Sequence, residues 1–181
     1  MEPTGEERLE AGVETILALP VSSVQSHEEL LVRAIQTASG SDLPKRLRVR
    51  AALRLAKIFA LPDRGASRAE VLEFEVMLWP LRNVFLQDPV VSFDLSEVCR
   101  TALNLEKIAD FICSKLSEAT QGDFPEQMWF VMLDLAAWHA DRGEEAEVRR
   151  LWHLAHSAPK RMQDPRVLSH FYGWRFDNEP G

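Results

Sequence analysis

Apolar residues recur at helical spacing along almost the whole chain. Four sites place a Ser or Asp three residues before a Glu, so that each side chain can bond the other residue's free backbone amide at a helix start. The four pairs are Ser26 with Glu29, Ser67 with Glu70, Asp94 with Glu97, and Asp123 with Glu126. Alternating apolar and polar runs are missing, as are Asn-Gly and Asp-Gly hairpin dipeptides. The sequence therefore predicts an all-α protein.

Prolines and glycines divide this pattern into helices joined by short links. The predicted helices cover residues 6–19, 27–38, 44–61, 68–86, 95–120, 125–141, 144–158 and 165–172. Pro80 should kink or split the fourth helix, because proline donates no backbone hydrogen bond. The span 95–120 is long for a globular helix, and we expect a break near Asn104.

The length of 181 residues suits one domain with a sizeable core. We expect a single helical domain over residues 1–181, built as an irregular bundle or a short α-superhelix. Helix 6–19 is expected to pack loosely, and residues 165–181 to form a C-terminal strap over the core. The aromatic cluster from Phe171 to Phe176 in this strap is also suited to be a docking peptide.

Charge and apolar patterning argue against nucleic acid and membranes as partners. The chain has 21 basic and 28 acidic residues, a net charge of −7, which repels phosphate backbones and argues against nucleic acid. An acidic N-terminal segment lacks the basic start of a secretory signal, and no apolar run is long enough to span a membrane. We therefore expect a cytoplasmic protein without membrane contact, in which Cys99 and Cys113 are buried thiols.

Two amphipathic segments joined at a glycine lie between Trp129 and Pro159. Small, bulky and turn residues occupy characteristic positions in them: Leu135, Ala136, His139, Gly143, Trp152, Ala155 and Pro159. In these positions the segment resembles a tetratricopeptide repeat, a helix-turn-helix unit of roughly 34 residues. Val148 departs from the family, which has Ala there. The resemblance implies an antiparallel helical hairpin near the C-terminus, either within a degenerate array or as an isolated unit.

The same resemblance implies a groove on the first helix of the hairpin. The groove positions of the family fall at Phe130, Leu133, Ala137, Ala140 and Asp141. This face lacks the Lys and Asn with which some members of the family bind a C-terminal carboxylate. A mostly apolar groove suits a partner peptide with hydrophobic anchors, or another helix of the same protein.

The segment 45–57 carries six basic residues and no acid in an otherwise acidic chain. Four of them recur at steps of four, four and three and form one stripe on a helix: Arg46, Arg50, Arg54 and Lys57. Arginine makes two-pronged contacts with carboxylates, so the stripe is suited to an acidic partner. Alternatively, the acidic helix that carries Glu70, Glu73 and Glu75 neutralises it internally.

Sequence motifs of common enzymes are missing, including phosphate-binding loops, the nucleophile elbow and HExxH. His139, His153 and His156, with Asp134 or Asp141, are the nearest approach to a metal site. His139 falls on a packing position of the hairpin, which favours a structural role. We expect no cofactor.

The sequence thus predicts a non-enzymatic interaction module of the adaptor, chaperone or immunity type, whose partner is another protein. The predicted partner-binding residues are Arg46, Arg50, Arg54, Lys57, Phe130, Leu133, Ala137 and Asp141. The alternative is a helical metal-dependent enzyme with a histidine and carboxylate site. Whether the chain also forms a homodimer is left open.

Overall fold

The computed structural model describes residues 4–21, 27–36, 43–120 and 128–157. These residues belong to two compact units, which span 1–114 and 115–181 and are described separately below. The expectation of a single domain stays a prediction. The caps at Ser26 and Asp123, the helix 165–172 and the strap 165–181 lie outside the described residues.

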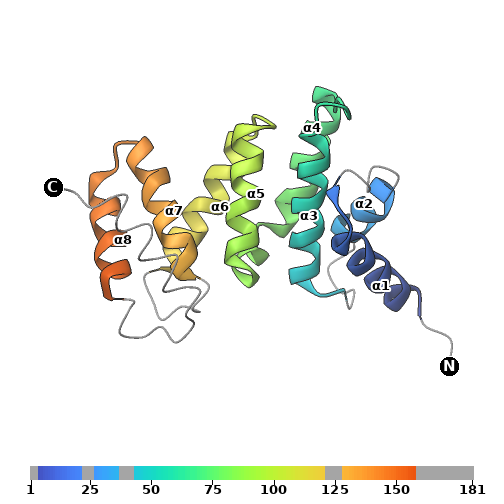
Figure 1. Cartoon of the computed structure of the whole chain (residues 1–181), viewed down its shortest axis with the longest axis horizontal. Helices are drawn as coiled ribbons and strands as arrows, with labels where there is room; N and C mark the ends of the chain where they lie inside the picture. Colours follow the sequence, from blue (N-terminus) through green and yellow to red (C-terminus); the bar gives the residue numbers. More distant parts are fainter. Residues whose placement is uncertain (1–3, 22–26, 37–42, 121–127, 158–181) are drawn as a thin grey trace. The chain divides into compact units, whose positions relative to one another are not determined.

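Every regular element of the described ranges is helical, which confirms the all-α prediction (Figure 1). None of these helices is long and apolar enough to cross a bilayer. The elements are α1 (Gly5–Ala18), α2 (Glu28–Gln36), α3 (Lys45–Phe59), α4 (Arg68–Leu78), the 3₁₀ helix η3 (Trp79–Gln87), α5 (Pro89–Thr101), α6 (Glu106–Ala119), α7 (Met128–Asp141) and α8 (Glu145–Ser157).

Reciprocal caps start two of the helices. At α4, the Glu70 carboxylate accepts from the Ser67 backbone N–H at 2.7 Å, and Ser67 Oγ accepts from the Glu70 N–H at 3.3 Å. The predicted cap at Ser67 is thus confirmed. Thr4 and Glu7 form the same arrangement at α1, which the sequence analysis missed. Such caps satisfy amides that have no partner within the first helical turn.

The predicted start at Asp94 is wrong, because α5 begins at Pro89 and Asp94 lies within it. Asp88 is the cap, and its carboxylate accepts from the Val91 N–H at 3.4 Å. Proline suits the first helical turn, where its missing donor costs nothing. The break expected near Asn104 is confirmed: α5 ends at Thr101, and Asn104 has the left-handed φ of 56°.

Pro80 divides the fourth predicted helix, as expected. The α-helical hydrogen bonding of α4 ends at Leu78, and η3 continues as a tighter 3₁₀ helix from Trp79 to Gln87. Proline cannot donate to the carbonyl one turn earlier, and its ring crowds the preceding turn. The change of helix type brings Leu81 and Phe85 of η3 into the core.

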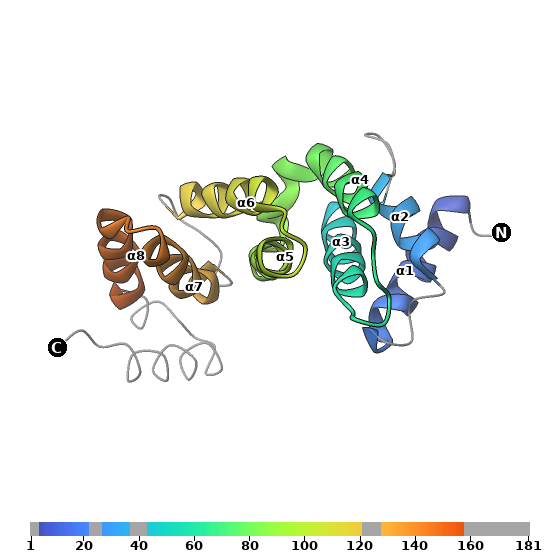
Figure 2. The same ribbon diagram turned by 90° about the horizontal axis from the view of Figure 1, so that it is seen from above.

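Helix α3 is the centre of the first unit, where it packs against α1, α2, α5 and η3. Figures 1 and 2 both show α3 between α5 on one side and the α1 and α2 pair on the other. Three fully buried alanines of α3, Ala51, Ala52 and Ala56, allow close approach of the neighbouring helices. Val49, Leu55 and Ile58 fill the space between them.

Two arginines of α3 bind the C-terminal ends of neighbouring helices. Arg54 donates to the carbonyls of Leu17 and Leu19 at 2.7 Å each, and Arg48 donates to the carbonyl of Ile35 at 2.9 Å. The last carbonyls of a helix lack intrahelical donors and lie at the negative end of its dipole. Arg54 therefore caps the end of α1, and Arg48 caps the end of α2.

In the second unit, α7 and α8 form an antiparallel hairpin (Figures 1 and 2). Gly143 occupies the turn with a φ of 72°, and the Glu144 N–H donates to the carbonyl of His139 at 3.0 Å. A left-handed residue at this position is a common helix C-terminus and favours glycine. Leu135 and Ala136 of α7 and Leu151 and Ala155 of α8 are buried.

The capping role of Arg54 predicts a stability difference between two neighbouring arginines. Arg54→Met should lower the free energy of unfolding by about 1–2 kcal/mol, because two helix-end carbonyls lose a charged donor. Arg50→Met, the matched control, should change it by under about 0.5 kcal/mol. Urea denaturation followed by circular dichroism measures both, and equal losses would contradict the cap.

Candidate functional site

Helix α4 carries a second apolar face that the core does not cover. Val71, Phe74 and Leu78 are buried, whereas Leu72, Val76 and Trp79 are 43%, 72% and 38% exposed. Leu72 and Val76 belong to α4, and Trp79 is the C-cap residue of α4 and the first residue of η3. The exposed three are spaced by four and three residues and therefore lie on one side of the helix. We call Leu72, Val76 and Trp79 the α4 ridge. Neighbouring exposed apolar side chains of this kind are typical of an interaction surface.

Trp79 is held in place by its neighbours. The Phe111 ring lies 5.4 Å from the indole ring, and the cationic groups of Arg82 and Lys107 lie 5.2 and 5.1 Å from it. Cations near an indole face are attracted to its negative charge density. A tryptophan oriented in this way loses little further side-chain entropy when a partner covers it.

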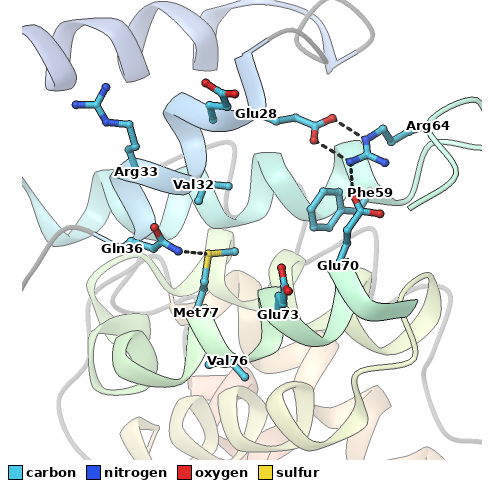
Figure 3. Close-up of a pocket in the computed structure, with 11 residues that line it drawn as sticks. Glu28, Val32, Arg33, Gln36, Phe59, Arg64, Glu70, Glu73, Val76 and Met77 are labelled. Atoms are coloured by element: carbon cyan, nitrogen blue, oxygen red, sulfur yellow. Dashed lines mark hydrogen bonds and ion pairs between the residues drawn. The ribbon is translucent and has the colours of Figure 1, made fainter. Parts of the chain in front are cut away.

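A cleft of about 700 Å³ lies beside the ridge, between α2 and α4 (Figure 3). Its apolar surface comes from three helices: Val32 of α2, Phe59 of α3, and Val76 and Met77 of α4. Val76 also borders a second, smaller hollow that contains Trp79. The cleft and the ridge are thus continuous through Val76. The remaining lining residues are Glu28, Glu29, Arg33, Gln36, Arg64, Glu70 and Glu73.

Arg64 joins α2 to α4 at one end of the cleft. Its guanidinium bonds the Glu28 carboxylate at 2.7 and 3.0 Å and the Glu70 carboxylate at 2.7 Å, as Figure 3 shows. The bond from Arg64, together with bonds from Ser67, lowers the pKa of Glu70 to about 2. At the other end, Gln36 contacts the Met77 sulfur at 3.2 Å. The two contacts fix both ends of the cleft.

The carboxylates of the cleft outnumber its cations. Four glutamates and two arginines line it, and Arg64 pairs with Glu28 and Glu70. Neither Glu29 nor Glu73 takes part in an ion pair with any other described residue. The cleft therefore has an excess of negative charge beside its apolar surface.

The predicted basic stripe on α3 is partly used inside the chain. Arg46 pairs with Asp88 at 2.7 Å, and Arg54 caps α1. Arg50 and Lys57 line a hollow of about 190 Å³. Neutralisation of the stripe by Glu70 is not observed, because Glu70 bonds Arg64 instead. All four residues stay predicted partner contacts, and the Arg46 side chain keeps 68% of its surface exposed beside Asp88.

The predicted groove residues of the hairpin differ in their exposure to solvent. Leu133 is 2% exposed, whereas Ala137, Ala140 and Asp141 are exposed. The side chain of Phe130 lies outside the described residues. Ala140 borders a hollow of about 390 Å³ with Val148 and Arg149, at the turn between α7 and α8. The exposed part of this face is thus formed by small and acidic side chains.

His139 belongs to a buried polar network in the second unit. Its Nδ1 lies 2.6 Å from the Glu144 carboxylate, and its Nε2 lies 3.2 Å from Ser117 Oγ. Arg150 donates to Ser117 Oγ at 3.2 Å and to Thr120 Oγ1 at 2.9 Å. The bond from His139 lowers the pKa of Glu144. Both ring nitrogens of His139 are therefore used in holding α6, α7 and the hairpin turn together.

Among the described residues, the other candidates for the alternative metal site form no cluster with His139. His153 is exposed on α8, and the side chain of His156 lies outside the described residues. Across the part of the chain that the structure describes, no group of three or more His, Cys, Asp or Glu is arranged to hold a metal ion.

Sequence reasoning missed both the ridge and the cleft. A signal was present: from Val71 to Trp79 the apolar residues cover more than one helical face. A helix of this kind has more apolar surface than one contact with a core can bury. The charge pairing of Arg64 had no comparable signal, because Glu28 is 36 residues away along the chain.

No protein-family model, no curated protein and no solved structure matched the chain significantly. The function is therefore inferred from the chain's own residues and their geometry.

The two cysteines predict a chemical test of the core of the first unit. Cys99 and Cys113 are buried, and burial raises the pKa of their thiols to about 12 and about 11. In the folded protein at pH 8, neither should react with iodoacetamide within minutes, whereas both should react in denaturant. Mass spectrometry of the alkylated chain measures this, and rapid labelling without denaturant would contradict the packing.

The Arg64 link predicts a pH dependence of stability. The pKa of Glu70 is about 2 when folded and ordinarily 4.5, so its contribution is complete above pH 4.5 and is lost as the pH falls toward 2. Glu70→Gln should flatten the decline of unfolding free energy over this range. Glu73→Gln, on the same helix but without an ion pair among the described residues, is the matched control. Denaturant titrations at several pH values decide, and parallel curves for the unmodified protein and Glu70→Gln would refute the link.

Proposed function

We propose that the chain is a non-enzymatic interaction module that binds another protein through the α4 ridge and the adjoining cleft. The observation that carries this proposal is the exposure of Leu72 and Val76 of α4 and of Trp79, its C-cap residue, on one side of the helix. Their continuity with the cleft through Val76 supplies a surface with both a raised and a recessed part. Adaptors, chaperones and immunity-type proteins all act by binding of this kind.

The energetics of burial support this role. Covering an exposed aliphatic or aromatic side chain contributes roughly 25 cal/mol for each Å² of apolar surface removed from water. Three adjacent side chains, one of them a tryptophan, can therefore supply several kcal/mol before the costs of association. Tryptophan at the centre of an interface is often a residue whose truncation weakens binding strongly.

The hairpin of the second unit supports the same class of function. A buried Leu135 and Ala136 and a left-handed Gly143 agree with the tetratricopeptide-like unit that we infer there. Helical hairpins of this kind expose extended faces for binding. Ala137 and Asp141 are exposed on α7 and are proposed as additional contacts.

We assign no metal-dependent activity to His139. To bind a metal ion, either ring nitrogen would have to give up its bond to Ser117 or to Glu144.

Two buried, unpaired thiols agree with the reducing cytoplasm that we propose as the compartment.

Site-specific photo-crosslinking tests the proposed surface. A benzophenone amino acid replaces Val76 in one variant and Ala146, which is exposed on α8, in the matched control. We expect a discrete adduct with a partner protein from position 76, and none from position 146. The additional substitution Leu72→Asp should remove the adduct, because a charge on the ridge opposes its burial. Circular dichroism checks that each variant is folded.

Two results would reject the proposal. One is the absence of an adduct from position 76, and the other is an adduct that persists unchanged with Leu72→Asp.

A further inference from the structure

The spacing of the α4 ridge favours a helix as the element that covers it. Together with the exposed Ala69, the ridge residues follow intervals of three, four and three. Intervals of this kind form the seam along which two helices pack side by side. A β-strand repeats every two residues and matches this spacing poorly. Leu72 and Trp79 are about 10 Å apart along the axis, so two turns of a partner helix cover the ridge.

The cleft accepts side chains of such a helix. Its ends are bridged by the Arg64 contacts and by the contact between Gln36 and Met77 (Figure 3). Along α4, residues 70 and 77 mark these ends, about 10 Å apart. This length admits anchors from one or two helical turns. Val32, Phe59 and Met77 offer these anchors an apolar surface.

The charges around the cleft specify the polar residues of the partner. Glu29 and Glu73 border the apolar surface and form no ion pair with another described residue. A partner with Lys or Arg beside its anchors would pair with them, whereas acidic flanks would be repelled. At the Trp79 end, Arg82 and Lys107 already lie against the indole ring. The basic residues of the partner therefore belong at the cleft end.

A second copy of the chain is a poor occupant for the same reason. Glu73 and the half-buried Glu75 flank the ridge on its two sides. Two copies of α4 packed face to face in parallel would bring these carboxylates together, and like charges across an interface oppose association. An antiparallel pair would instead place Glu73 of one copy near the Trp79 end of the other, and sedimentation of the chain alone tests it. A partner of opposite charge avoids this repulsion.

We propose that the ridge and cleft bind an amphipathic helix of another protein, with apolar anchors every three to four residues and Lys or Arg beside the anchors over Glu73. This proposal rests on the proposed function and specifies the class of partner. The basic flank selects among helices, and the ridge supplies the contact area.

A displayed peptide library tests the class of partner. Peptides of helical propensity, with randomised anchor and flanking positions, are selected on the full-length chain and counter-selected on Val76→Asp. We expect the enriched peptides to combine apolar residues at three- and four-residue intervals with a net positive charge. Enriched peptides that are acidic, neutral or without this spacing would overturn the proposal.

Charge reversal tests the role of the two glutamates. For a synthetic peptide from the enriched pool, the double substitution Glu29→Lys and Glu73→Lys should weaken binding about tenfold at low salt, as measured by fluorescence anisotropy. The loss should shrink as salt is added, because salt screens exposed charges. Glu6→Lys with Glu14→Lys makes the same charge change on exposed positions of α1 and should alter binding less than twofold. Equal effects of the two pairs would overturn the proposal.

The results separate this inference from the function on which it rests. If position 76 forms the crosslinked adduct but the library yields no basic helical peptide that fails to bind Val76→Asp, the interaction module stays in place and the helical partner is rejected. The absence of both rejects the interaction module as well. Sedimentation of the chain alone tests the second copy: a dimer that Val76→Asp dissociates would overturn the proposal.

Discussion

The packing of α3 is the constraint on which the first unit depends. Its alanines allow α1, α2 and α5 to approach closely, and Arg48 and Arg54 hold the C-terminal ends of α2 and α1. The position of α2 follows from this packing, and so does one wall of the cleft. Two of the basic residues of α3, Arg48 and Arg54, thus stabilise the packing of the first unit.

The cleft exists because α4 is tied to the rest of the unit at few points. Phe74 and Leu78 anchor it to the core, and Arg64 links it to Glu28 at one end. Between these points, α2 and α4 leave a space that other side chains do not fill. Helix α4 has two apolar faces, and the core buries only one of them. The other face is available for contact with a partner. This is the physical basis of the proposed module.

In the second unit, a polar network binds both ring nitrogens of His139. Buried polar groups are stable only when they are bonded, and Glu144, Ser117 and Arg150 satisfy His139 and each other. The sequence analysis placed His139 correctly in the packing of the hairpin. Its partners could not be predicted, because Ser117 lies on a different helix, 22 residues earlier.

The sequence by itself determined the features that depend on neighbouring residues. Helical periodicity, the cap at Ser67, the change of helix at Pro80 and the turn at Gly143 all follow from contacts within a few residues. The tertiary structure decided which arginines are used internally and which face of α4 is left exposed. These outcomes depend on charges and surfaces that are distant in the chain and meet only after packing. Asp94 shows the boundary between the two: it has the pattern of a cap, yet Pro89 and the burial of Phe93 place it inside a helix.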